Sequence, residues 1–213
     1  MKKIFLLLSI FFYSIISFAQ ENNYKKKDYL ITIKTNLGDI QLILFDATPL
    51  HKDNFVKLAK RGYYDGTTFH RVIPNFMIQG GDSLSKDDNP NNDGQGGPGY
   101  TIPAEFVDSL KHDRGMIAAT RLGDGVNPQK RSSGSQFYIV QNKAGTHFLN
   151  GGYTVYGKVV KGLDVVDKIV AAKKDNRDRP LENITMRVSL KKISKKKYFK
   201  LYKVRSTGYK DKN

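Results

Sequence analysis

Arg71 is the residue of this chain whose surroundings most clearly suggest chemistry. It is the one cation in the β-prone, apolar run from Thr68 to Ile73, and Phe76, Met77 and Gln79 follow at short spacing. An arginine beside an apolar and aromatic surface could bind a group that is both apolar and a hydrogen-bond acceptor. A proline ring with its amide is one such group.

Several common kinds of catalytic site are excluded by the sequence. There is no cysteine, which rules out thiol chemistry and zinc–thiolate sites. The four histidines are scattered and no His-Glu-x-x-His motif occurs, so we expect no metal. Ser135 lies inside a Gly-Ser-Gln-Phe run and not in a Gly-x-Ser-x-Gly elbow. No glycine loop that could hold phosphate precedes a helix start, so we expect no cofactor.

The order of residues around Arg71 resembles the signature of the cyclophilin family of peptidyl-prolyl cis-trans isomerases. Three further segments extend the resemblance, and the first of them is similar to bacterial members: Gly96–Phe106, Gly134–Val140 and His147–Val159. Together they cover about residues 29–190, so the resemblance implies an isomerase that acts on X-Pro bonds of unfolded or flexible polypeptides.

The resemblance also implies the residues of the active site. The expected catalytic residues are Arg71, Gln79 and Phe76. The expected substrate-binding residues are Met77, Thr120, Arg121, Gln136, Tyr138, Phe148, Leu149 and Tyr153. Rotation about an X-Pro bond frees the lone pair of the prolyl nitrogen, so a donor fixed on that nitrogen binds the transition state more tightly than either ground state. Arg71 is the expected donor, and Gln79 and Gln136 are expected to orient it and the substrate carbonyl.

Five of these positions depart from the best-known eukaryotic pattern. Thr120 stands where alanine is usual, and Arg121 where asparagine is common. Tyr138 replaces phenylalanine, Phe148 replaces tryptophan and Tyr153 replaces histidine. These departures bear on drug affinity and sequence preference more than on catalysis.

Local patterns predict the elements that would position these residues. Alternating apolar residues over 29–33 and 40–44, around an Asn-Leu-Gly-Asp turn, indicate a β-hairpin. Thr48 and Pro49 are typical of a helix start, with Gly62 as the stop signal. A second helix is predicted over about 163–171. Residues 82–99 and 123–133 are rich in polar residues and glycine and are expected to be loops.

The fold class follows from many short strands and few helices. Further strands are predicted at 115–120, 134–140 and 184–190, and this pattern favours a mainly β protein built as a closed antiparallel barrel. The resemblance implies a cyclophilin-like barrel of eight strands that is capped by two α-helices.

The N-terminus is typical of a secretory signal peptide. Two lysines precede an almost wholly apolar run from Ile4 to Phe18, and small residues close it before Gln20. We expect residues 1–19 to be a signal peptide and 20–28 a flexible spacer, which places the product in the periplasm. Secretion, or an uncleaved signal that serves as an anchor, is the alternative.

Basic charge is concentrated at the C-terminus. The net charge is +16, and ten basic residues but a single acidic one follow from Lys191 onward. We expect residues 29–190 to form the domain and 191–213 a poorly ordered basic tail. The tail could make weak, non-specific contact with anionic surfaces. We expect no specific nucleic-acid partner, and a monomer.

Two other functional classes compete with the enzyme. The chain could be a client-binding chaperone module whose isomerase activity is incidental, or a binder of anionic surfaces that uses its basic tail. The complete set of site residues around Arg71 favours the enzyme, because a module that only binds has no need of a fixed hydrogen-bond donor.

Overall fold

The computed structural model describes residues 27–87 and 89–206, with side chains as far as Leu201. The predicted signal peptide, most of the predicted spacer and the last seven residues of the tail lie outside the described residues. The regular elements in chain order are β1 (Lys27–Thr35), β2 (Gly38–Leu44), α2 (Pro49–Lys60), β3 (Arg71–Ile73), β4 (Met77–Gly80), η1 (Leu84–Lys86), β5 (Thr101–Ile102), β6 (Met116–Ala119), β7 (Ser132–Ser133), β8 (Phe137–Val140), η2 (His147–Leu149), β9 (Val155–Lys161), α3 (Leu163–Val170), β10 (Met186–Ser194) and α4 (Lys195–Ser206).

Eight of the strands form one sheet in the order β10-β1-β2-β9-β6-β8-β4-β3, and β5 pairs separately with β7. The prediction of a mainly β protein is therefore confirmed. The predicted hairpin is confirmed as well, because β1 and β2 pair antiparallel with Ile31 opposite Leu42 and Ile33 opposite Ile40. All four side chains are completely buried. Alternation along each strand sends them to one face, where they build the core.

The two edges of this sheet are β10 and β3, and no strand ladder joins them within the described ranges. The strand order of the described residues therefore shows an eight-stranded antiparallel sheet and not a closed barrel. The residues just before β3 bond to those at the start of β10: the N–H of Gly66 donates to the carbonyl of Met186 at 2.9 Å, and the N–H of Phe69 donates to that of Ile184 at 2.9 Å. A single antiparallel bridge joins Thr68 and Thr185.

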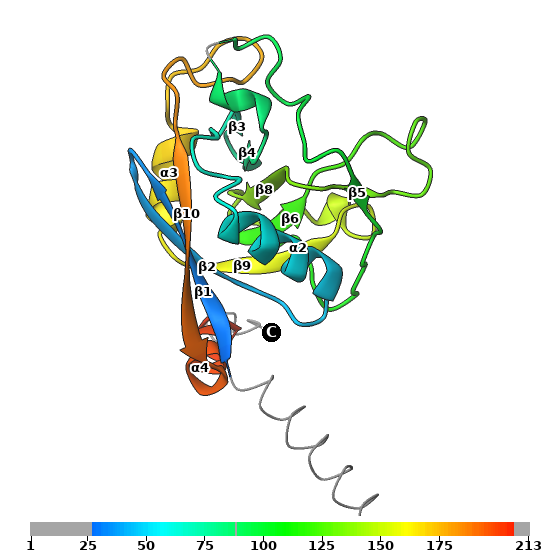
Figure 1. Ribbon diagram of the computed structural model, residues 1–213, viewed down its shortest axis with the longest axis vertical. Helices are drawn as coiled ribbons and strands as arrows, with labels where there is room; N and C mark the ends of the chain where they lie inside the picture. Colours follow the sequence, from blue (N-terminus) through cyan, green and yellow to red (C-terminus); the bar gives the residue numbers. More distant parts are fainter. Residues whose placement is uncertain (1–26, 88, 207–213) are drawn as a thin grey trace, which may run out of the picture. The chain divides into compact units, whose positions relative to one another are not determined.

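Two helices pack on the sheet as expected from the sequence. α2 starts at Pro49 and contacts β9, and α3 contacts β2, β3 and β4. Figure 1 shows the two helices over separate parts of the sheet. The backbone after α2 has a positive φ of 67° at Gly62, which favours glycine and ends the helix there. None of the helices in the described part of the chain is long and apolar enough to cross a membrane.

Within its described residues, 82–87 and 89–99, the 82–99 segment is irregular except for η1, as predicted, but it is less solvated than expected. The Asp82 side chain is completely buried and that of Asp93 is only 6% exposed. Burying a carboxylate is costly unless it is paired. Asp82 accepts hydrogen bonds from the N–H groups of Leu84, at 2.9 Å, and Gly94, and Asp93 forms an ion pair with Arg179.

The chain divides into two compact units, one formed by residues 30–191 and the other including 27–29 and 192–206. The expectation of little order beyond Lys191 is wrong for the described part of the tail, because β10 continues to Ser194 and α4 follows it. Ion pairing and burial explain the order. Lys195 lies 2.9 Å from a carboxylate oxygen of Asp28, and Tyr198 is buried.

Candidate active site

Arg71, Gln79, Tyr138 and Ala118 form one row across four neighbouring segments of the sheet. Arg71 on β3 faces Gln79 on β4, which faces Tyr138 on β8, which faces Ala118 on β6. Residues directly opposite each other on paired strands share a face of the sheet, so these side chains lie in sequence along one face. Ala118 is in turn paired with Val155 on β9.

Arg71 is exposed, and its orientation depends on two glutamines. Its Nη1 lies 3.5 Å from Oε1 of Gln79, and Nε2 of Gln79 donates to Oε1 of Gln136 at 3.1 Å. Gln136 is buried and donates through Nε2 to the carbonyls of Gly94 at 2.9 Å and Gly96 at 2.8 Å. The structure therefore brings three of the predicted polar site residues, Arg71, Gln79 and Gln136, into one chain of hydrogen bonds.

Aromatic and apolar side chains lie beside this chain of polar groups. Met77 is two residues before Gln79 on β4, so both side chains point to the same face, and Met77 is buried. Phe76 precedes the strand and is half-buried. The Phe148 ring, on η2, stacks on it with centroids 5.9 Å apart and planes 21° apart. Phe148 is 78% exposed, which leaves most of its face open to a ligand.

Tyr138 forms part of a buried polar network that the sequence did not indicate. The backbone N–H of His112 donates to Oδ1 of Asn150, and ring Nδ1 lies 2.8 Å from the same oxygen. Nδ1 must then carry the proton, which leaves Nε2 to accept from the Tyr138 hydroxyl at 2.8 Å. Burial lowers the pKa of His112 and raises the pKa of Tyr138, so both groups stay neutral and the bond is kept.

The guanidinium group of Arg121 is engaged by neighbouring groups of the protein. Its guanidinium group lies 4.7 Å from the Tyr153 ring centroid, Nε donates to the carbonyl of Gly152 at 2.6 Å, and Nη1 pairs with Asp124 at 2.5 Å. The Tyr153 ring meets that of Tyr138 edge-on, with centroids 6.0 Å apart. Arg121 therefore supports the aromatic side of the site, and its charge is already paired.

Thr120 and Leu149 contribute mainly through the backbone. The N–H of Thr120 donates to the carbonyl of Gln136 at 3.1 Å, and its own carbonyl accepts from Ser133 at 2.8 Å. These bonds fix the segment that carries Gln136. Leu149 is half-buried and closes the η2 turn with a bond from its N–H to Thr146 at 3.0 Å.

Sequence reasoning missed four residues that hold the site: Gly94, Gly96, His112 and Asn150. The glycines had a usable signal, because repeated glycines in a polar loop often mark a close approach of backbone. His112 and Asn150 are far apart in the sequence, and no local pattern links them to Tyr138.

The side chains gathered here offer hydrogen bonds and apolar contact. Within residues 27–87 and 89–206, no group of three or more histidine or carboxylate side chains is placed to hold a metal ion. The site instead offers a permanently charged fork of N–H donors, held by glutamines, beside exposed and half-buried aromatic rings. This combination suits a ligand with an apolar ring and an adjacent amide.

Comparisons with known proteins identify the family to which the chain is similar. A family model described as cyclophilin type peptidyl-prolyl cis-trans isomerase/CLD matches residues 30–189. The peptidyl-prolyl cis-trans isomerase CYP18-1 of Arabidopsis thaliana is 42% identical over 161 residues, which are 73% of this chain and 91% of that protein. A peptidyl-prolyl cis-trans isomerase of Acinetobacter baylyi is 42% identical over 146 residues, 66% of this chain and 71% of that protein.

A solved structure is similar as well. The crystal structure of a cyclophilin type peptidyl-prolyl cis-trans isomerase of Cryptosporidium parvum, in the presence of the dipeptide ala-pro, matches with a TM-score of 0.66 and 30% identity. The match covers 76% of this chain and 98% of that one.

Proposed function

Because this chain belongs to the cyclophilin-type peptidyl-prolyl cis-trans isomerase family, we propose that it accelerates rotation of X-Pro bonds in exported client proteins and so assists their folding. The activity itself is that of the family. The proposal adds the class of client, flexible or unfolded polypeptides, and the residues that act on them.

The required rate enhancement is within reach of a single well-placed donor and an apolar site. Rotation about a peptide bond faces a barrier of ~18–20 kcal/mol. A turnover of about 10–10³ s⁻¹ corresponds to a barrier of roughly 13–16 kcal/mol, so the protein must supply about 5 kcal/mol. No covalent step is needed, because only the resonance of the amide has to be broken.

Arg71 supplies the donor in this proposal. As the X-Pro bond twists, the prolyl nitrogen becomes pyramidal and its lone pair accepts a hydrogen bond that the planar amide cannot accept. The guanidinium group is always charged, and Gln79 keeps it near one orientation at a distance of 3.5 Å. A donor that is already in place does not have to reorganise during the reaction.

The surrounding side chains hold the substrate. Phe76, Met77 and Tyr138 form the apolar surface for the proline ring, and Phe148 covers it from the solvent side. Gln136 acts through Gln79, because its NH₂ group and its oxygen are already engaged by Gly94, Gly96 and Gln79. The observation that carries the proposal is the unbroken series of bonds from the buried Gln136 to the exposed Arg71.

A protease-coupled isomerisation assay on a short X-Pro peptide tests the activity. We expect acceleration over the uncatalysed rate that saturates with peptide concentration. A protein that is folded by circular dichroism but does not accelerate isomerisation would refute the assignment for this chain.

Export rests on the N-terminal sequence alone, which lies outside the described residues. We propose cleavage after Ala19 and a periplasmic product. Mass spectrometry of the purified protein from a cell envelope fraction should find Gln20 at the N-terminus. Recovery of the full-length chain from the soluble cytoplasm would contradict this part of the proposal.

The chaperone function remains the second candidate because apolar side chains stand exposed near the site. Leu122 is 68% and Val126 76% exposed, on the loop that begins at Arg121. If binding is the main role, Leu122→Ser with Val126→Ser should abolish suppression of client aggregation and leave turnover of a short peptide unchanged. Leu181→Ser is the matched control, since Leu181 is 63% exposed elsewhere.

We also propose that the sheet closes into a barrel through the bonds between residues 66–69 and 184–186. Closure would fix the strand that carries Arg71 at its edge.

The basic tail is proposed to act only non-specifically. Any binding to heparin should weaken steeply as salt rises from 50 to 200 mM, because it depends on release of counterions.

A further inference from the structure

We propose that Arg179 is a positioning residue of the active site: through its ion pair with Asp93 it fixes the loop whose carbonyl groups set the side chain of Gln136, and thereby those of Gln79 and Arg71. This inference rests on the catalytic role proposed for Arg71. We refer to residues 89–96 as the 89–96 loop and to residues 174–183 as the 174–183 segment.

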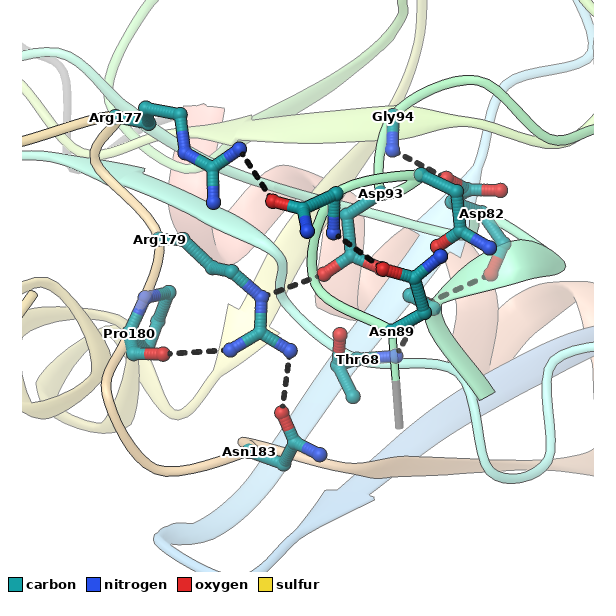
Figure 2. Close-up of polar contacts among 12 residues, drawn as sticks. Thr68, Asp82, Asn89, Asp93, Gly94, Arg177, Arg179, Pro180 and Asn183 are labelled. Atoms are coloured by element: carbon teal, nitrogen blue, oxygen red, sulfur yellow. Dashed lines mark hydrogen bonds and ion pairs between the residues drawn. The ribbon is translucent and has the colours of Figure 1, made fainter. Parts of the chain in front are cut away.

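The ion pair is nearly withdrawn from solvent. Nε of Arg179 lies 2.7 Å from Oδ2 of Asp93, and the two side chains are 15% and 6% exposed. The remaining guanidinium nitrogens donate to the carbonyl of Pro180 at 3.1 Å and to Oδ1 of Asn183 at 2.8 Å. Figure 2 shows these three contacts spreading from one side chain. Arg179 is thus held within its own segment and presents one donor to the 89–96 loop.

The backbone next to Asp93 has little freedom. The N–H of Gly94 donates to the completely buried carboxylate of Asp82, as Figure 2 also shows. Gly94 has a φ of 89°, which favours glycine, and a Cβ on Gly96 would lie 2.1 Å from Oδ1 of Asp82. Asp82 and Asp93 therefore fix the carbonyl groups of Gly94 and Gly96 from two sides.

These carbonyl groups determine the direction of every bond that follows. A carbonyl can only accept, so Gln136 must turn its NH₂ group toward Gly94 and Gly96. Its oxygen then accepts from the NH₂ group of Gln79. The oxygen of Gln79 is left to face the guanidinium group of Arg71. A reversed Gln79 would turn its NH₂ group toward a cation, which is repulsive.

The 174–183 segment also holds the strand of Arg71 directly. The N–H of Val72 donates to the carbonyl of Asp178 at 2.8 Å, and Nζ of Lys174 donates to the carbonyl of Val72 at 3.2 Å. β3 is an edge strand, so this segment takes the place of a further strand beside it. Arg71 is therefore fixed from its backbone and, through Asp93 and Gln136, from its guanidinium group.

The test compares Arg179→Met with Arg177→Met. Arg177 lies in the same segment and bonds Asn91 of the same loop at 3.1 Å, but its side chain is 55% exposed. We expect Arg179→Met to lower kcat about tenfold on a short X-Pro peptide, with KM changed less than twofold, because the donor is misdirected while the apolar surface remains. Arg179→Lys should recover part of the loss. Arg177→Met should match the wild type.

A double-mutant cycle separates positioning from general destabilisation. In a Gln136→Ala background the series of bonds is already cut, so Arg179→Met should cause no further loss of kcat. Additive losses, or a folded Arg179→Met protein with wild-type kcat, would overturn the inference. If Arg179→Met does not fold, Asp93→Asn, which keeps the shape and removes the buried charge, takes its place in the same cycle.

The experiment also distinguishes this inference from the proposed function. Inactivity of the wild type, or full activity of Arg71→Ala, would refute the role of Arg71 itself. Loss of activity in Arg71→Ala with no effect of either Arg179→Met or Asp93→Asn would refute only the role of Arg179.

Discussion

Phe148 is one of the five site residues that depart from the best-known cyclophilin pattern, in which tryptophan stands at this position. Its ring stacks on Phe76 but offers no N–H donor, whereas an indole does. We therefore expect cyclosporin-type macrocycles to inhibit weakly, and Phe148→Trp to improve the inhibition constant about tenfold, the value of one added hydrogen bond. Competition in the peptide assay measures both. Tight inhibition of the wild type without improvement in Phe148→Trp would contradict this.

At the residue scale, the sequence predicted which residues form the site but not all of the contacts that they make. Residues of the family signature converge because strand register places Arg71, Gln79 and Tyr138 in one row. The pairing of Arg121 with Asp124 and Tyr153 could not be foreseen, because a free and a paired arginine look alike in a sequence. The hydroxyl group that distinguishes Tyr138 from phenylalanine bonds Nε2 of His112, and no local sequence pattern reveals this partner.

At the scale of elements, the start of α2 shows how tertiary contacts replace local ones. Thr48 occupies the predicted cap position but makes no capping bond with its side chain. Glu105 does so instead, accepting from the N–H groups of Leu50 and His51, both at 3.0 Å. A carboxylate at a helix N-terminus is also favoured by the helix dipole.

We expect Glu105→Ala to lower the free energy of unfolding by at least about 1–2 kcal/mol, the usual cost of losing a helix cap, because the variant also loses the contact of Glu105 Oε2 with ring Nδ1 of the buried His51 at 2.6 Å. Thr48→Val is the matched control and should change stability less, because it keeps the buried volume, removes no capping bond and loses only the long contact of its hydroxyl with the Phe45 carbonyl at 3.5 Å. Urea unfolding of both variants gives the comparison. A larger loss in Thr48→Val than in Glu105→Ala would show that the local cap dominates after all.

The secondary structure itself was largely accessible from the sequence. Alternation predicted the β1–β2 hairpin, and Pro49 and Gly62 predicted the limits of α2. The order of α4 was not accessible, because a lysine-rich stretch looks solvated until its partners are known, here Asp28 for Lys195. The burial of the carboxylates in the 82–99 segment could not be predicted for the same reason.

At the scale of the whole molecule, buried histidines make stability depend on pH. His51, His70 and His112 are buried, and burial lowers the pKa of each below its ordinary value of 6.5. The unfolded chain then binds protons before the folded one as the pH falls. The free energy of unfolding is therefore highest above about pH 6.5 and decreases below it, by up to ~1.4 kcal/mol per pH unit for each histidine.

Urea unfolding between pH 8 and 5 measures this dependence. His112→Gln should reduce the slope below pH 6.5, because one of the three groups no longer titrates. Asp175 titrates in a separate and lower pH range. The hydrogen bond from the backbone N–H of Arg179 is the largest cause that lowers the pKa of its carboxyl group. A stability that stays constant from pH 8 to 5 would contradict the expectation.

The activity of the whole protein depends on Arg71, which is proposed to stabilise the twisted X-Pro bond. The kcat of Arg71→Ala tests it most directly, with Phe76→Ala as control and melting curves to establish folding. We predict that kcat falls about 10²–10³-fold in Arg71→Ala, the cost of one preorganised donor, while peptide affinity changes little. Phe76→Ala should lose affinity together with turnover. A folded Arg71→Ala protein with near wild-type kcat would contradict the account.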